Sequence, residues 1–190
     1  MDIMTLAFIL VPIGITYFWY AGIISKRNRA NEALSGVDVQ LKKRSSLIPN
    51  ILKIAQKFME HEKSLLTEIT ELRSRMESDY SPGDKESVQR HLAAAEQLDG
   101  KMGQLMVAVE DYPDLKSDAT MVQAMQSYNE VEAQIAAARR FYNSAVTSLN
   151  NAVQIFPGNL IARMAGVAEM PFYEVDEASR APVDADDYLK

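Results

Sequence analysis

An uncharged run opens the chain, and stretches with a helical spacing of apolar residues follow it. Residues 3–24 contain no charged side chain, and at about 1.5 Å rise per residue a helix of this length reaches roughly 33 Å. That is enough to cross a bilayer core of about 30 Å, so we predict a retained membrane anchor over residues 1–25. Pro12 does not exclude such a helix, because neighbouring turns re-satisfy the freed backbone groups. The residues that characterise the anchor are Ile3, Phe8, Pro12, Tyr17, Trp19, Tyr20 and Ile24.

Two other interpretations of this run are a cleaved signal peptide and a buried core helix. A signal peptide carries its positive charge before the apolar run, whereas here Lys26, Arg27 and Arg29 follow it. An uncharged run of this length is also unusual in a soluble domain of this size. The positive-inside rule then predicts a single-pass protein of the inner or plasma membrane, with the N-terminus outside and the remaining chain cytoplasmic. Lys26, Arg27 and Arg29 are candidates for contact with anionic lipid.

The rest of the chain predicts an all-α fold. Apolar residues recur three or four apart over residues 26–79, after the turn 81–84 as far as 111, and over 117–156. Pro49 predicts a kink or short break at 47–50; otherwise the anchor continues into this helix as one rod. A short helix is expected at 159–168. We therefore predict an antiparallel bundle of three long helices and a short C-terminal helix over residues 26–170, followed by an acidic, extended or disordered tail over 171–190.

The predicted core consists of the apolar residues that share a face on each helix. In the first helix these are Val37, Leu41, Ile48, Leu52, Ala55, Met59, Leu66, Ile69 and Leu72. In the second they are Val88, Leu92, Ala95, Leu98, Leu105 and Val109. In the third they are Met121, Met125, Tyr128, Ile135, Tyr142, Val146, Leu149, Val153 and Phe156.

Four charged residues fall in phase with these apolar faces: Arg44, Glu62, Glu132 and Arg139. They can lie at the edge of the stripe with their charged ends in water. They can also form ion pairs between helices, because a buried charge without a partner is strongly unfavourable. A functional polar site is the third interpretation.

Composition and motifs give no support to an enzyme. The chain has no cysteine, which removes disulfides, thiolate metal sites and cysteine nucleophiles. His61-Glu62 starts like a zinc-protease motif, but Leu65 stands where the second histidine is needed. We therefore expect no catalytic residue, cofactor or metal. The net charge of −6 and the lack of a recognition motif argue against nucleic acid as a partner.

Several short runs resemble the LemA family in sequence and in order. They are Val37–Asn50, His61-Glu62-Lys63, Tyr112–Lys116, Ala137–Asn143 and Phe156–Asn159, while the acidic tail after about Glu174 lies outside the pattern. The resemblance implies an N-terminal transmembrane helix and a long antiparallel helical bundle, and it implies no established reaction. The positions shared with the family pattern are Leu47, Ile48, Pro49, Asn50, His61, Tyr112, Pro113, Tyr142, Asn143, Phe156 and Pro157.

These features predict a non-enzymatic structural or scaffolding protein that self-associates through its bundle at the membrane surface. Its expected partners are membrane lipid, further copies of the chain and a membrane protein of unspecified identity. The alternative is a signalling or protease-associated adaptor that docks a partner through its basic stretch or its acidic tail.

Overall fold

All regular elements of the described chain are helices, which confirms the predicted all-α class. The structure is a computed structural model that describes residues 3–173, without the side chains of residues 3, 5–7 and 9, so the anchor candidate Ile3 and the tail 174–190 lie outside the described groups. The helices are α1 (Ile3–Ala55), α2 (Lys63–Met76), α3 (Lys85–Val109), α4 (Pro113–Lys116), α5 (Ala119–Gln154) and α6 (Gly158–Met164).

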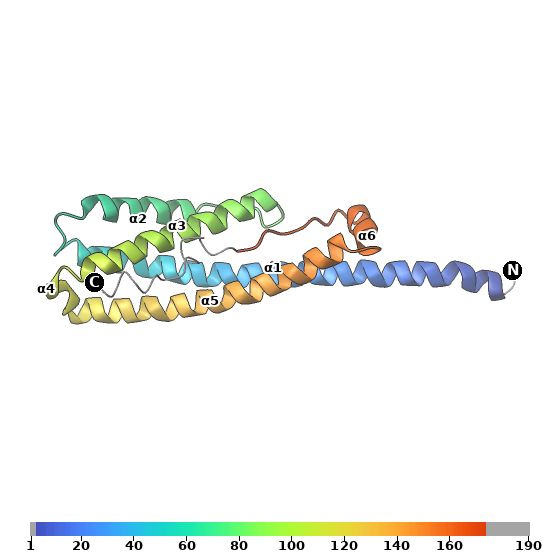
Figure 1. Cartoon of the computed structure of the whole chain (residues 1–190), viewed down its shortest axis with the longest axis horizontal. Coiled ribbons are helices and arrows are strands. Elements are labelled where there is room, and N and C mark those ends of the chain that lie inside the picture. Colours follow the sequence, from blue (N-terminus) through green and yellow to red (C-terminus); the bar gives the residue numbers. More distant parts are fainter. Residues whose placement is uncertain (1–2, 174–190) are drawn as a thin grey trace, which may run out of the picture.

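The helices form an elongated rod, and α1 is its longest component (Figure 1). Helix α5 lies antiparallel beside α1, and the hairpin of α2 and α3 covers the end of the rod farthest from the N-terminus. Helix α6 packs on α1 and α5 at the other end, and the chain after it returns along the rod. The first turns of α1 extend beyond the bundle, so one helix continues from the apolar N-terminal run into the core.

Polar caps fix where two of these helices begin. The carboxylate of Asp84 accepts a hydrogen bond from the backbone N–H of Ser87 at 2.9 Å, which starts α3 directly after the predicted turn. Asp118 caps α5 in the same way through the backbone N–H of Met121 at 2.9 Å. Each cap satisfies one of the N–H groups that the first turn of a helix leaves without a partner.

Helix α1 runs through Pro49 without interruption, so the short break that was one of the two predicted outcomes at this proline is wrong. A proline has no N–H for the carbonyl four residues earlier, here that of Ser45. The Nε–H of Arg73 in α2 donates to this carbonyl at 3.0 Å and so replaces the missing bond. The chain breaks at residues 56–62 instead, and the stretch predicted as one helix becomes α1 and α2.

We predict that this replacement bond makes the effects of substitutions at positions 49 and 73 on the free energy of unfolding depend on each other. Arg73→Met should lower the free energy of unfolding by about 1 kcal/mol, because it leaves the Ser45 carbonyl without a donor. In a Pro49→Ala background the alanine N–H supplies the bond, so the same substitution should cost less, with a coupling of about 0.5 kcal/mol or more. Urea denaturation of the four proteins measures it. Arg75→Met, on the exposed side of α2, is the control, and equal coupling at positions 73 and 75 would contradict this assignment.

The predicted core is buried with four exceptions. Leu72, Met125 and Val153 are half-buried, and Phe156, which lies two residues beyond the end of α5, is 73% exposed. The remaining predicted positions of all three helical stretches are buried against one another, so the apolar stripes define one continuous core.

Candidate functional site

Arg44 lies at the centre of the bundle, where α1, α3 and α5 meet. Its side chain is fully buried. One terminal nitrogen, Nη1, donates to Glu132 at 3.1 Å and to Asp99 at 3.4 Å, and Nη2 donates to the backbone carbonyl of Ala95 at 2.7 Å. The planar guanidinium can serve several acceptors at once, which a lysine ammonium on a flexible stem does less well. The sequence left three interpretations of these charged residues open. For Arg44 and Glu132 the structure shows the second one, an ion pair between helices.

The electrostatics of this polar centre reflect competition between burial and ion pairing. Burial by itself would lower the pKa of Arg44, but the nearby Tyr128, Glu132 and Asp99 outweigh it and hold the pKa above its ordinary value. For Glu132 burial is the larger effect and raises its pKa, although Arg44 acts in the opposite direction. Burial also raises the pKa of Tyr128, so this phenol stays protonated. The centre therefore holds a buried cation against partly exposed carboxylates, and these contacts connect α1, α3 and α5.

The raised pKa of Glu132 predicts how stability depends on pH. Between the ordinary value of 4.5 and the raised value, the folded chain binds the proton more tightly than the unfolded chain. Stability attributable to this group is therefore lost as pH rises through that window. Compared with Glu132→Gln, the unsubstituted protein should lose stability between mildly acidic and neutral pH. Urea denaturation of both proteins at the two pH values measures the difference. A difference that stays constant, or grows in favour of the unsubstituted protein, would contradict this.

The other two seam candidates lie elsewhere. Arg139 is half-buried, and its guanidinium carbon lies 4.2 Å from the centre of the Tyr173 ring, a cation–π contact. Glu62 precedes the first residue of α2 and makes no ion pair within the part of the chain that the structure describes. Sequence reasoning missed Asp99, although it lies four residues after Ala95 and so in phase with the apolar face of its own helix.

Residues 170–173 form an extended strap along α5. The side-chain amide of Asn150 bonds both the backbone N–H and the carbonyl of Met170, at 3.0 and 2.9 Å. Asn143 does the same for Tyr173, at 2.9 Å in each case, and the hydroxyl of Tyr142 donates to the Pro171 carbonyl at 2.7 Å. The predicted tail is thus extended at its start, but its first residues are packed into the fold. This gives Tyr142 and Asn143, two family-pattern positions, a structural role.

A second polar cluster joins α1 to the start of α3. Tyr80 donates to Asp38 at 2.5 Å, and the other carboxylate oxygen lies 3.2 Å from Nε2 of His91. The rings of Tyr80 and His91 stack with their centres 4.0 Å apart. Within the described residues no group of three or more histidine, aspartate or glutamate side chains could hold a metal ion. His61, the other histidine, is exposed and lies in the connection between α1 and α2.

The remaining family-pattern positions lie along α1 and at helix ends. Ile48 is buried, Leu47 is half-buried, and Pro49 and Asn50 are exposed. Tyr112 and Pro113 begin the single turn α4, and a cis peptide bond joins Phe156 to Pro157. A Cβ at Gly158 would lie 2.2 Å from the carbonyl oxygen of Ala152, so only glycine allows α6 to approach α5 this closely.

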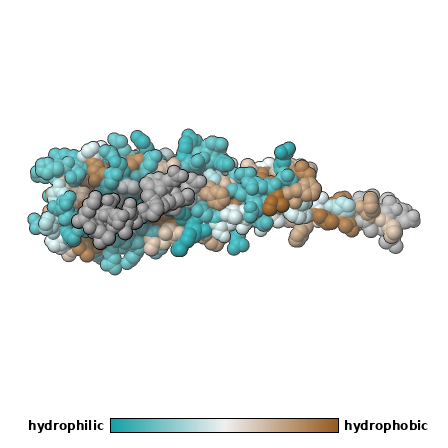
Figure 2. Space-filling view, in the orientation of Figure 1, coloured by the Kyte–Doolittle hydropathy of each residue, from teal (hydrophilic) through white to brown (hydrophobic). Residues whose placement is uncertain are grey.

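The end of the rod that carries α6 and the first part of α1 is apolar. Figure 2 shows apolar residues gathered there, whereas the α2–α3 end is largely hydrophilic. We call this surface the apolar end. Its exposed large side chains are Met4, Phe8, Leu10, Val11, Ile13, Ile15, Tyr17, Phe18, Trp19 and Tyr20 in α1, with Ile155, Phe156, Leu160 and Met164 at and before α6. An exposed apolar surface of this extent indicates an interaction site.

No helix, over the residues that the structure describes, is long and apolar enough to cross a membrane. The spanning anchor predicted from Phe8, Pro12, Trp19 and Ile24 is therefore not confirmed. Of its members, Phe8, Pro12, Tyr17, Trp19 and Tyr20 are exposed, and Ile24 is half-buried. The basic candidates Lys26, Arg27 and Arg29 are all exposed and follow directly along α1.

These features define a class of protein: an elongated all-α bundle with a buried ion-pair cluster at its centre and an apolar end. The chain belongs to the LemA family, whose family model matches residues 33–186. That match confirms the resemblance seen in the sequence. It also extends through most of the acidic tail, which was expected to lie outside the family pattern.

Individual relatives agree with this assignment. Protein LemA of Metamycoplasma hominis is 27% identical over 181 residues, which cover 93% of this chain and 80% of that protein. Magnetosome proteins MamQ 1 and MamQ 2 of Paramagnetospirillum magneticum are each 32% identical over 82 residues. That stretch covers 43% of this chain and 30% of each magnetosome protein.

Proposed function

We propose that this protein is a non-enzymatic scaffold that the uncharged N-terminal run anchors in the membrane and that self-associates through its bundle. The observation that carries the proposal is the apolar end, where large side chains of α1 and α6 are exposed together. Aromatic side chains such as Tyr17, Trp19 and Tyr20 are favoured at the boundary between the bilayer core and the headgroups. The exposed cations Lys26, Arg27 and Arg29 then follow at headgroup level, where each can contribute roughly 1 kcal/mol on anionic lipid.

The continuity of α1 supports a scaffolding role. The same helix carries the apolar run and the bundle core, with no linker between them. From Ser25 to Ala55 a helix rises about 45 Å, so the hydrophilic α2–α3 end would stand well away from the lipid. Such a rod presents its sides to neighbouring copies or to a membrane-protein partner at a fixed height.

The proposed orientation is a single pass through the inner or plasma membrane, with the N-terminus outside and the bundle cytoplasmic. It is supported by the full uncharged run of the sequence and by the cations after it. Because the chain has no cysteine, a single Ser117→Cys variant can be labelled in intact cells with a membrane-impermeant thiol reagent. Labelling only after the inner membrane is permeabilised supports this orientation, and labelling before it contradicts it.

Self-association is tested on the purified, detergent-solubilised protein. Sedimentation velocity over a wide concentration range should show a large homo-oligomer. Cross-linking between single-cysteine variants on the exposed face of α5 should form dimers and higher species in vesicles. A monodisperse monomer at every concentration, together with no cross-linked species in vesicles, would contradict the proposed scaffold.

A further inference from the structure

Two grooves at the apolar end meet at Tyr17 and Tyr20. One groove, of about 520 Å³, lies between α1 and α6 and is apolar, with Pro12, Ile13, Ile161 and Met164 in its walls. The other, of about 740 Å³, continues along α1 towards the bundle and is lined by polar groups as well as by the same two tyrosines. The two grooves therefore adjoin one another at these two tyrosines, and the apolar groove gives way to the more polar one along α1.

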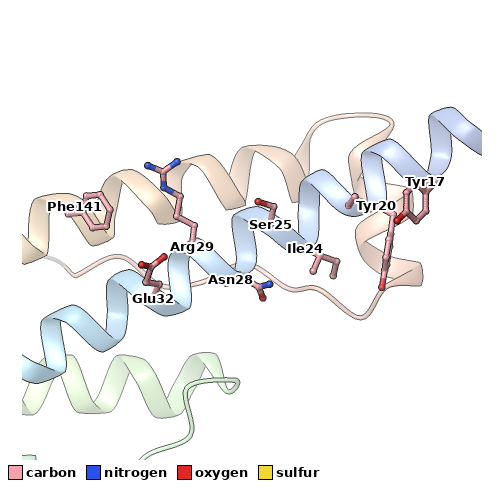
Figure 3. A pocket seen from close by; sticks show the side chains of 9 residues that line it. Tyr17, Tyr20, Ile24, Ser25, Asn28, Arg29, Glu32 and Phe141 are labelled. Atoms are coloured by element: carbon pink, nitrogen blue, oxygen red, sulfur yellow. The ribbon is translucent and has the colours of Figure 1, made fainter.

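The polar groove carries one positive and one negative charge at its inner end. Figure 3 shows Tyr17 and Tyr20 at one end of this groove, and Arg29, Glu32 and Phe141 at the other. Arg29 and Glu32 are three residues apart on α1, a spacing that places side chains about 5–6 Å apart at Cβ. Both are exposed, and neither forms an ion pair with another described residue. Both charges are therefore available to a ligand.

We propose that the two grooves hold one phospholipid whose headgroup carries both a phosphate and a primary ammonium. An acyl chain lies in the apolar groove between α1 and α6, the phosphate accepts hydrogen bonds from Arg29, and the ammonium donates to Glu32. The inference rests on the proposed membrane association, because it requires the apolar end to lie in the bilayer. It goes further by assigning a lipid class and the residues that select it.

The apolar and polar side chains follow one another along α1 in the same order as the acyl chain and the headgroup of such a lipid. The apolar groove involves α1 only as far as Tyr20, and the polar side chains Ser25, Asn28 and Arg29 come after it. From Tyr20 the helix rises about 7 Å to Ser25, which is comparable with the thickness of one headgroup layer, and about 13.5 Å to Arg29, whose long side chain can reach back towards that layer. A lipid that enters with its chains towards the N-terminus of α1 would therefore place its phosphate at the level of these side chains.

Glu32 distinguishes between headgroup classes. A primary ammonium has three N–H donors that can form charge-assisted hydrogen bonds to a carboxylate. A quaternary choline has none, and the uncharged glycerol of phosphatidylglycerol offers only neutral hydroxyl donors, which bond a carboxylate less strongly than an ammonium does. The pair of charges therefore favours an ethanolamine-type headgroup over both.

Trp19, the single tryptophan of the chain, lies on the same turn of α1 as Tyr20 and is 37% exposed, so quenching of its fluorescence reports lipid close to the two grooves. The full-length protein is reconstituted in phosphatidylcholine vesicles that contain a small fraction of lipid brominated on its acyl chains, which quenches tryptophan fluorescence on contact. Brominated phosphatidylethanolamine should quench Trp19 as if it were about threefold more concentrated than its mole fraction, the size of effect that one exposed charge pair supports. Brominated phosphatidylcholine and phosphatidylglycerol at the same fraction should give less.

Glu32→Gln should reduce the quenching by phosphatidylethanolamine to that of phosphatidylcholine, and Arg29→Gln should reduce quenching by both phosphatidylethanolamine and phosphatidylglycerol. Glu71→Gln, on the exposed face of α2, is the matched control and should change nothing. Equal quenching by the three lipids, stronger quenching by phosphatidylglycerol, or an unchanged preference in Glu32→Gln would overturn the lipid site.

Flotation of the protein with vesicles is measured in the same samples. Failure to float contradicts the proposed membrane association itself, whereas flotation without lipid preference contradicts only this inference.

Discussion

The triple variant Val11→Glu, Ile15→Glu, Phe18→Glu should no longer bind lipid vesicles. The three side chains are exposed and lie on one face of α1, at spacings of four and three residues. Each loses roughly 1.5–3 kcal/mol of transfer free energy and gains a charge that the bilayer disfavours. We therefore expect vesicle partitioning to fall by at least about 100-fold, measured by flotation of the purified protein on anionic vesicles.

A matched control tests whether the position of the charges matters. Val39→Glu, Val107→Glu, Val122→Glu adds the same three charges at exposed valines outside the apolar end. This control should float like the unsubstituted protein, and circular dichroism should show full helix content in both variants. Equal loss of flotation in the two triple variants would mean that net charge, and not the apolar end, governs binding.

Arg44→Met should be the most destabilising single substitution in the bundle. It removes the cation from between Glu132 and Asp99 and leaves Glu132, with a side chain only 26% exposed, without its partner. Breaking a buried ion pair from one side costs about 3–5 kcal/mol. Because Glu132 and Asp99 keep some contact with water, we expect the lower part of that range, measured as the free energy of unfolding in urea.

The double variant Arg44→Met, Glu132→Leu separates the ion pair from the packing of the arginine stem. Apolar replacement of both partners is often nearly neutral, so most of the lost stability should return. Arg140→Met, on the exposed face of α5, should change stability by less than about 0.5 kcal/mol. If the double variant is no more stable than Arg44→Met alone, the polar centre stabilises the fold through something other than the ion pair.

The helices and most of the core could be predicted because they follow from local spacing. The apolar faces of α3 and α5 repeat every three or four residues and become buried almost as expected. Asp84 and Asp118 begin their helices through bonds to residues three positions later, which is also local information.

The parts that the sequence did not predict depend on contacts between distant residues. The break expected at Pro49 is absent because Arg73, 28 residues from Ser45, supplies the missing donor. The strap is held by Asn143 and Asn150, whose partners lie 30 and 20 residues away. For the polar centre, periodicity identified Arg44 and Glu132 as buried candidates, but only the packing of α3 against α1 shows Asp99 as the other partner.

The central claim is that α1 holds the bundle upright on the membrane, with α6 at the lipid surface. Because the chain has no cysteine, a donor fluorophore can be attached at Leu160→Cys in α6 or at Ser117→Cys beside α4, both exposed. Energy transfer to an acceptor lipid in the vesicle should be strong from position 160 and weak from position 117, since the length of α5, about 53 Å of helix rise, separates the two levels. Equal transfer from both positions would mean that the rod lies flat on the bilayer or does not bind through its apolar end, and would contradict the account.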